Sequence, residues 1–215
     1  TMVKINIILR ILIFMFVTEV LSELSPVEIN EAYHQSYTLE KAQNYLKAIE
    51  VLTPVIKSYP NGYTINFRMG WLTYLNGNYA NALKYYRKAL AVYPASIEVL
   101  GSISLVYKAR LDWKKVEEEN YKILKIDYFN LTANYWYIKA LQVQKKYDQA
   151  EKVCHKVLSV YPTAVNFLYL LGENCYYMGR KDDALSYFGS VYTLDPYNIG
   201  AKEYLELMTN KNNSK

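Results

Sequence analysis

The sequence predicts an all-α fold, an α-solenoid of five antiparallel helix-turn-helix repeats that ends in a capping helix. The first observation behind this prediction is a marker that recurs every 34 residues, at Pro60, Pro94, Tyr128, Pro162 and Pro196. The second is a small or β-branched residue twelve positions before each marker, at Ala48, Ala82, Val116, Ala150 and Ala184. A unit of this length is too small to bury its own apolar face, so such units become stable by stacking on their neighbours.

Each unit is predicted to contain two helices joined by a tight turn. Residues 65–75 and 80–92 carry apolar side chains at i, i+3, i+4 and i+7, which is typical of amphipathic helices. Gly77 and Gly179 lie between two such segments, where a chain that leaves a helix often needs a positive φ. The small residues let the two helix axes approach closely. The proline ends the second helix because it cannot donate the next backbone hydrogen bond.

The 34-residue spacing also sets the predicted boundaries within a solenoid over residues 23–208. The repeats are expected at residues 29–62, 63–96, 97–130, 131–164 and 165–198. Residues 199–208 have apolar side chains at helical spacing and are predicted to form a cap helix, because the last repeat would otherwise expose its apolar face. Residues 209–215 form a polar tail.

The first repeat carries two further signals. Ser25-Pro26-Val27-Glu28 is typical of a capping box with proline at the first helical position, so the first helix is expected to begin near Pro26. Pro54 lies well inside the second helix of this repeat. A kink or a short break is therefore predicted there.

These units resemble the tetratricopeptide repeat family, whose signature is W-x2-L-G-x2-Y, then G-x-Y-x2-A, F-x2-A and P. The second repeat matches best, at Met69, Gly70, Tyr74, Gly77, Tyr79, Ala82, Tyr86, Ala89 and Pro94. The fifth repeat is close to the signature, and the first and third depart from it most, the third at Val116, Asn120 and Tyr128. The resemblance implies a right-handed α-solenoid that binds a partner, but a fold of this kind does not specify which partner.

The N-terminal residues 1–22 have a different character. They contain an early lysine, an apolar run that Arg10 interrupts, and small residues at Val20 and Ser22. This pattern predicts a secretory signal peptide that is cut between Ser22 and Glu23, and so an extracytoplasmic protein: secreted, periplasmic or in the lumen of the secretory pathway. Two alternatives are an uncleaved membrane anchor through residues 3–21 and an ordinary amphipathic segment.

The charge balance argues against a nucleic-acid partner. The chain has 25 Lys and Arg against 20 Asp and Glu, a formal net charge of +5. Loss of residues 1–22 would leave 23 basic and 19 acidic residues. Acidic residues are mixed with the basic ones, as Lys114-Lys115 followed by Glu117 illustrates. Such an arrangement is typical of a solvated surface rather than of a basic patch.

No pattern in the sequence predicts catalysis, a cofactor or a metal. His34 and His155 are the only histidines and lie several repeats apart, and the chain has no phosphate-binding loop, dinucleotide motif or G-x-S-x-G motif. Cys154 and Cys175 fall at core positions and are predicted to be buried free thiols, with a disulfide as the alternative. We therefore expect a protein that is not an enzyme, with no catalytic residue, no metal and no cofactor.

The resemblance implies that the first helix of each repeat lines a concave groove. Groove positions in this chain are rich in aromatic residues, whose rigid apolar area suits protein recognition. The residues predicted to contact a partner are Tyr33, Tyr37, Phe67, Arg68, Trp71, Tyr74, Lys108, Tyr135, Lys139, Tyr169, Glu173 and Tyr176. The four charged residues of this set would orient the partner. The alternative is that the rings pack on one another across adjacent repeats.

Three functions are compatible with this groove. The first is an exported protein-interaction scaffold that holds an extended or helical segment of a protein or peptide partner. The second is a self-associating structural solenoid that forms a homo-oligomer, and the third is a carbohydrate-binding accessory protein. The family members that bind chaperone tails do so with a cationic clamp, but here those positions carry Tyr33, Tyr37, Glu98 and Ser102. We therefore expect no binding of acidic chaperone tails by that mechanism.

Overall fold

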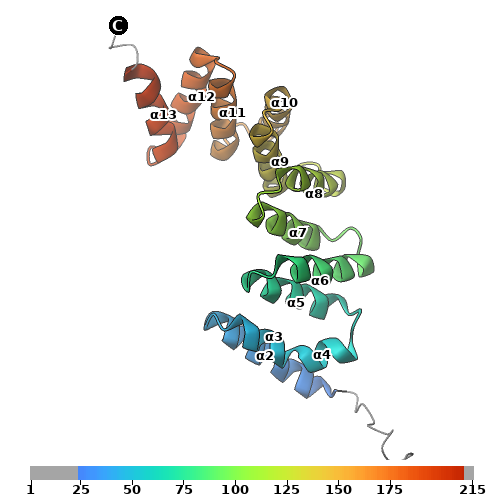
Figure 1. Ribbon diagram of the computed structural model, residues 1–215. Coiled ribbons are helices and arrows are strands. Elements are labelled where there is room, and N and C mark those ends of the chain that lie inside the picture. The colour runs from blue at the N-terminus through green and yellow to red at the C-terminus, as the bar shows by residue number, and fades with distance from the viewer. Residues whose placement is uncertain (1–23, 211–215) are drawn as a thin grey trace, which may run out of the picture. The chain divides into compact units, whose positions relative to one another are not determined.

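A computed structural model describes residues 24–210, and within this range the chain is all-α, with twelve helices and no strand (Figure 1). The helices are α2 (Pro26–Lys41), α3 (Tyr45–Val51), α4 (Thr53–Ser58), α5 (Tyr63–Leu75), α6 (Tyr79–Val92), α7 (Ile97–Ala109), α8 (Trp113–Ile126), α9 (Leu131–Val143), α10 (Tyr147–Leu158), α11 (Val165–Tyr177), α12 (Lys181–Leu194) and α13 (Ile199–Asn210). The signal peptide predicted at residues 1–22 lies outside the described residues. Across residues 24–210, no helix is both long enough and apolar enough to span a bilayer.

The helices divide between two compact units, the first ending at Pro60 and the second beginning at Asn61. In the first unit, α2 packs against α3. The predicted capping box is confirmed: the Ser25 Oγ accepts a hydrogen bond from the backbone N–H of Glu28, and the Glu28 carboxylate accepts one from the backbone N–H of Ser25. The predicted break is also confirmed, because the second helix is interrupted at Leu52 and Pro54 lies in the first turn of α4. Proline is accommodated there since the first turn needs no donor from it.

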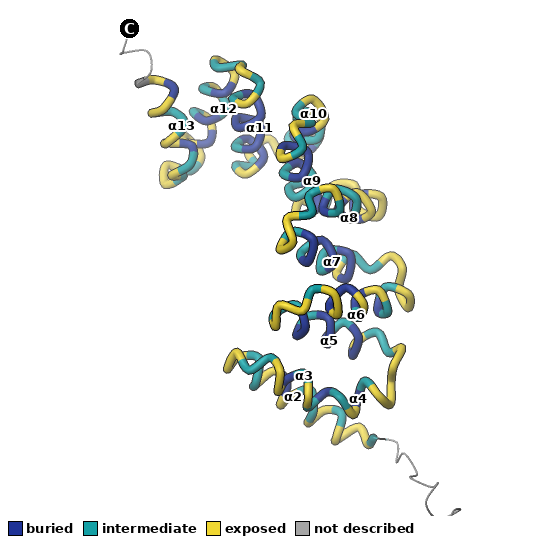
Figure 2. Tube along the Cα trace, in the orientation of Figure 1, coloured by how far each residue is buried: buried dark blue, intermediate teal, exposed yellow. Residues whose placement is uncertain are grey.

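The second unit contains four helix hairpins and the closing helix α13. From α5 to α13 each helix packs on the next, and α5 also contacts α7 as α9 contacts α11. Figure 2 shows that buried positions follow the helix faces that are turned toward neighbouring helices. The predicted stacking of helix pairs is therefore confirmed within this unit.

Small side chains lie where the two helices of a hairpin cross. The residues twelve positions before each marker are all 0% exposed: Ala48, Ala82, Val116, Ala150 and Ala184. The apolar residues five positions before each marker are at most 3% exposed: Val55, Ala89, Ile123, Val157 and Val191. Short side chains at these positions permit close approach of the helix axes.

The turn inside each hairpin has the same backbone conformation in all five repeats. Gly77 and Gly179 have the predicted positive φ, and the same position in the other repeats holds Gln43, Leu111 and Lys145, with φ between 56 and 59°. In each turn the next residue donates its N–H to the carbonyl five positions earlier, at 2.8–3.0 Å. This is the hydrogen bond of a Schellman motif, and it closes the turn whether or not glycine is present.

Two glycines are required by close packing rather than by backbone conformation. A Cβ added to Gly70 would lie 2.5 Å from the ring of Tyr86, and one added to Gly172 would lie 2.9 Å from the ring of Phe188. Each pair is separated by sixteen residues and joins the two helices of one hairpin. The absent side chain in the first helix therefore makes room for the aromatic ring in the second.

The other repeats of the second unit fill the same position differently. In the third repeat the pair is Ser104 and Asn120, and the Asn120 Nδ2 donates to the Ser104 Oγ at 2.7 Å. In the fourth repeat the pair is Ile138 and Cys154, both fully buried. Because protein interiors are close-packed, a larger residue on one helix is matched by a smaller one on the other. Asn120, which departs from the family signature, is therefore part of a matched pair.

The closing helix α13 covers the last hairpin as predicted, although it extends to Asn210 rather than ending at Met208. Ala201 and Met208 are buried against α12 and its neighbours. The ring of Tyr204 stacks on Phe188 with the centroids 4.4 Å apart. Burial of this apolar surface is what a terminal repeat requires.

Candidate binding surface

Ten of the twelve residues predicted to contact a partner lie in the second unit, on α5, α7, α9 and α11, while Tyr33 and Tyr37 lie on α2. Arg68 and Glu173 are buried, with 6% and 8% of their surface exposed. Such depth does not fit their predicted role of orienting a partner by direct contact. The other eight residues in this unit are half-buried: Phe67, Trp71, Tyr74, Lys108, Tyr135, Lys139, Tyr169 and Tyr176.

Several of these rings pack on other rings of the protein. Trp71 stacks on Tyr74 with the centroids 5.7 Å apart. Tyr169 and Tyr176 both contact the ring of Tyr204 in α13, at 6.2 and 5.0 Å. Aromatic pairs in these arrangements stabilise the fold beyond the area they bury. Part of the aromatic enrichment of the groove positions therefore serves packing, as the alternative interpretation expected.

An open cleft remains between the N-terminal halves of α9 and α11, and we call it the α9–α11 cleft. It has a volume of about 490 Å³ and is lined by Leu131, Thr132, Tyr135, Trp136, Ala164, Val165, Asn166 and Phe167. Tyr135 and Trp136 meet edge to face, with the ring centroids 5.1 Å apart. Thr132 and Asn166 are exposed, so the cleft combines an aromatic wall with two polar side chains that solvent can reach.

Of the residues that line this cleft, only Tyr135 belongs to the set predicted to contact a partner. Ala164 occupies the N-cap position of α11, where the equivalent Ser96 and Asn130 accept hydrogen bonds from backbone N–H groups of their own helices. A methyl group provides no such cap and occupies less space beside the first turn. The lack of a capping side chain at position 164 is the feature of the sequence that could have indicated the cleft.

Two lysines lie close to the aromatic wall. The Lys108 Nζ lies 3.3 Å from the centroid of the Trp136 ring, a cation–π contact. Burial lowers the pKa of Lys108, because desolvation disfavours the charged form. One turn from Tyr135, the Lys139 Nζ lies 3.1 Å from the Glu173 carboxylate, which joins α9 to α11. Lys139 is thus held by an internal ion pair, and Lys108 by an aromatic ring.

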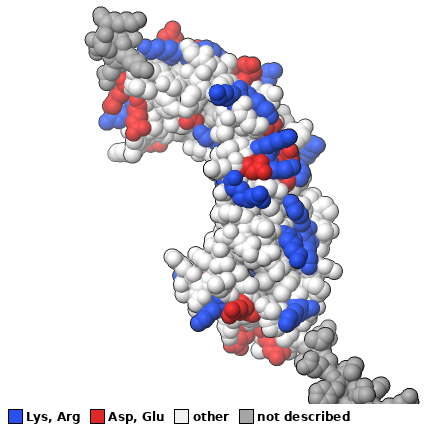
Figure 3. Space-filling view, viewed as in Figure 1, with Lys and Arg blue, Asp and Glu red and all other residues white. Residues whose placement is uncertain are grey.

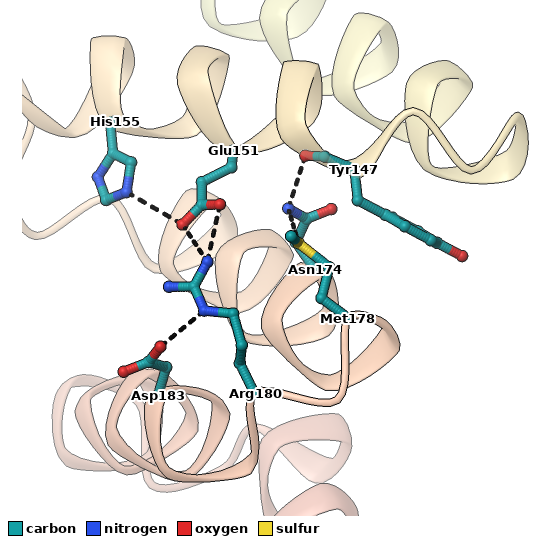
Figure 4. Close-up of polar contacts among 7 residues, drawn as sticks. All are labelled: Tyr147, Glu151, His155, Asn174, Met178, Arg180 and Asp183. Atoms are coloured by element: carbon teal, nitrogen blue, oxygen red, sulfur yellow. Dashed lines mark hydrogen bonds and ion pairs between the residues drawn. The ribbon is translucent and has the colours of Figure 1, made fainter.

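Other charged residues tie the fourth repeat to the fifth (Figure 4). The Glu151 carboxylate accepts two hydrogen bonds from Arg180 Nη1, at 2.8 and 2.9 Å, and Arg180 Nε donates to Asp183 at 2.8 Å. His155 is exposed, and its Nε2 lies 3.6 Å from the same glutamate. The Glu117 carboxylate accepts a hydrogen bond from Lys146, again 29 residues further along the chain. These contacts give the charged residues a structural role between neighbouring repeats.

Basic and acidic side chains are interspersed over the second unit. Figure 3 shows acidic groups among the basic ones along the middle of the visible face. Lys115 pairs with Glu118 and Lys122 with Glu119 on the same helix. Both pairs join residues one turn apart on α8, so these charged side chains have partners within their own helix.

The two cysteines are buried free thiols, as predicted. Burial raises the pKa of Cys154 and of Cys175, since an apolar environment disfavours the thiolate. Among residues 24–210, no group of three or more His, Cys, Asp or Glu side chains is arranged to hold a metal ion.

Comparison with known proteins identifies relatives of the same fold. Residues 33–97 match the family model of the tetratricopeptide repeat. A tetratricopeptide repeat protein from Parabacteroides merdae has a similar structure, with a TM-score of 0.77 and 20% identity over 86% of this chain and 75% of that one. MamA aligns with a TM-score of 0.69 and 15% identity over 80% of this chain and 96% of its own.

Two further relatives carry functional descriptions of their own. YrrB, described as a repeat protein of this family with an unusual peptide-binding site, aligns with a TM-score of 0.68 and 15% identity over 84% of this chain and 91% of its own. Subunit 3 of the anaphase-promoting complex from Schizosaccharomyces pombe is 21% identical over 174 residues, which is 79% of this chain and 26% of that protein. The chain therefore spans about a quarter of that relative's length.

Proposed function

We propose that this chain is a non-enzymatic interaction scaffold that holds a segment of a partner protein in the α9–α11 cleft. The match of residues 33–97 to the tetratricopeptide repeat and the likeness in fold to solved proteins of that family support the proposal. The observation that carries the proposal is the cleft itself, an open and mainly apolar hollow with Tyr135 and Trp136 in its wall. Aromatic side chains of this kind dominate the energetics of many protein interfaces.

The dimensions of the cleft suit a peptide segment. Its volume of about 490 Å³ lies within the range of pockets that hold ligands. One or two apolar side chains of a partner would fill it, and Thr132 and Asn166 could then bond to the partner's backbone. YrrB, which is similar in fold, is described as binding a peptide, and this supports the same class of ligand here.

The proposal is tested by closing the cleft and by removing its wall. Asn166→Trp would fill the cleft from an exposed position, and Tyr135→Ala would remove one of its rings. We expect both variants to lose proteins that the wild-type chain captures from its native compartment, as measured by quantitative mass spectrometry. Tyr192→Ala, an exposed tyrosine on the second helix of its repeat, is the matched control. Retention of every captured protein by both cleft variants would contradict the proposal.

Self-association is a second candidate because one apolar position is exposed in four consecutive repeats. It lies at or just beyond the end of the second helix and is 43–48% exposed in Val92, Ile126, Val160 and Leu194. A repeated apolar position of this kind is suited to contact between copies. If the candidate is right, the wild-type chain sediments as an oligomer and an Ile126→Lys, Val160→Lys variant as a monomer. A monomeric wild-type chain at micromolar concentration would exclude it.

We propose further that the scaffold acts outside the cytoplasm, on the basis of the signal-like residues 1–22. N-terminal sequencing of the native protein tests this proposal. A mature chain that begins at Glu23 is the expected result. A chain in a membrane fraction that retains residues 3–21 would instead support the anchor.

A further inference from the structure

Lys108, unlike Lys139, has no acidic partner among the described residues. Its Nζ lies over the Trp136 ring at 3.3 Å, and among the ion pairs within residues 24–210 none involves Lys108. Lys139, the neighbouring groove lysine, is neutralised by Glu173 at 3.1 Å. Within the described part of the chain this half-buried ammonium group contacts an aromatic face and no carboxylate, so it retains an unsatisfied preference for an anion.

The same indole ring also lines the α9–α11 cleft. An apolar side chain in the cleft would contact Trp136, and a group that pairs with Lys108 would lie beside the ammonium group held on the same ring. Neighbouring side chains of one short peptide can span a single ring in this way. We infer that the partner segment carries a side-chain carboxylate next to an apolar residue, the carboxylate pairing with Lys108 and the apolar group entering the cleft.

This inference rests on the proposed function and specifies which side chains the partner segment carries. An aspartate or glutamate would form a charge-assisted hydrogen bond with the ammonium group. Burial already lowers the pKa of Lys108, and an approaching carboxylate would favour the charged form again. The chemistry is that of a side chain within a peptide, so a free chain end is not needed.

The experiment is a selection from a displayed library of random peptides with amidated ends, carried out on the whole chain. We expect wild-type protein to enrich Asp or Glu beside Leu, Phe or another apolar residue. Replacing the acidic residue of a selected peptide by its amide should weaken binding roughly tenfold, the loss of one charge-assisted hydrogen bond. This comparison needs no change in the protein and so is independent of folding.

Protein variants provide the complementary comparison. Lys108→Gln should bind the acidic peptide and its amide equally, and Lys108→Arg should keep the preference. Lys108→Glu should select Lys or Arg beside the apolar residue. Lys114→Gln is the matched control, since it makes the same change at an exposed lysine on α8.

Two results would overturn the inference. Selected peptides without an acidic preference, or a preference that persists in Lys108→Gln, would show that Lys108 does not receive a carboxylate, while peptide binding by the scaffold would stand. If wild-type protein selects no peptide at all, both the inference and the proposed peptide-binding function fail.

Discussion

Replacing Gly70 by alanine tests whether the hairpin packing has been understood. In an exposed helix interior this change is favourable by about 1 kcal/mol, because alanine has the higher helix propensity. At Gly70, however, the new Cβ would lie 2.5 Å from two carbons of the Tyr86 ring, which is fully buried. An ordinary contact needs at least 3.4 Å, so the ring would have to move by about 1 Å in a close-packed interior.

Overpacking of this kind costs about 1–3 kcal/mol and often more when a ring cannot rotate away. We therefore expect Gly70→Ala to lower the free energy of unfolding by about 1–3 kcal/mol in spite of the gain in propensity. Gly101→Ala is the matched control, since Gly101 also lies inside a first helix and a Cβ there would meet nothing within 4 Å. That control should raise the free energy of unfolding by about 0.5–1 kcal/mol.

Urea unfolding followed by far-ultraviolet circular dichroism measures both changes. In a Tyr86→Leu background the cost of Gly70→Ala should shrink, because the smaller side chain leaves room for the methyl group, and a double-mutant cycle isolates this coupling. If Gly70→Ala is as stable as Gly101→Ala in the wild-type background, the ring tolerates the methyl group and our account of the pair is wrong.

Three other predictions follow from the backbone and from the pKa shifts. Leu111→Gly should raise the free energy of unfolding by up to about 1 kcal/mol, because the exposed leucine adopts a left-handed conformation that costs about 1–2 kcal/mol; a loss of stability on urea unfolding would contradict this. Cys154 and Cys175 should resist maleimide at about pH 8 until the chain is unfolded, since burial raises both pKa values; labelling of the native protein at the rate of a free thiol would refute it. Burial also raises the pKa of Tyr169 from 10.0 to about 12. Above the unfolded value the unfolded chain therefore loses protons that the folded chain keeps, and the free energy of unfolding should fall as the pH rises through about 10; a flat profile there would contradict the shift.

Some helix ends could be predicted because they depend on local chemistry. Proline cannot continue a helix, and the second helices end two to four residues before Pro60, Pro94, Pro162 and Pro196. Pro54 likewise interrupts the second helix of the first repeat, as predicted. The capping box at Ser25 depends on residues three apart. Such short-range rules need no knowledge of the rest of the chain.

Short-range rules could not predict the backbone conformation of the turns or the matched residue pairs inside the hairpins. Leu111 and Lys145 adopt a positive φ that no propensity would assign to them, since the backbone hydrogen bonds of the turn impose it. Asn120 departs from the family signature, and its partner Ser104 becomes evident only when both helices are in place. These features depend on two positions at once, whereas a signature treats each position separately.

The sequence could assign the candidate groove residues to helices but could not give their exposure. The resemblance to the repeat family assigned Tyr135 and Lys108 to first helices, and they lie in α9 and α7. It could not indicate that neighbouring repeats bury Glu173, or that Tyr169 packs on α13. The cleft depends on Ala164, a residue outside the groove positions. The solvent exposure of a side chain depends on how the helices pack together, so it cannot be predicted from the spacing of residues within one helix.

The matched residues inside the hairpins restrict how this protein can be redesigned. A chimera that joined α7 to α6 would force the Tyr86 ring against Ser104, and one that joined α5 to α8 would leave a void between Gly70 and Asn120. Single helices are therefore not interchangeable parts. Lengthening, shortening or shuffling the chain should succeed only when both helices of a repeat are moved together.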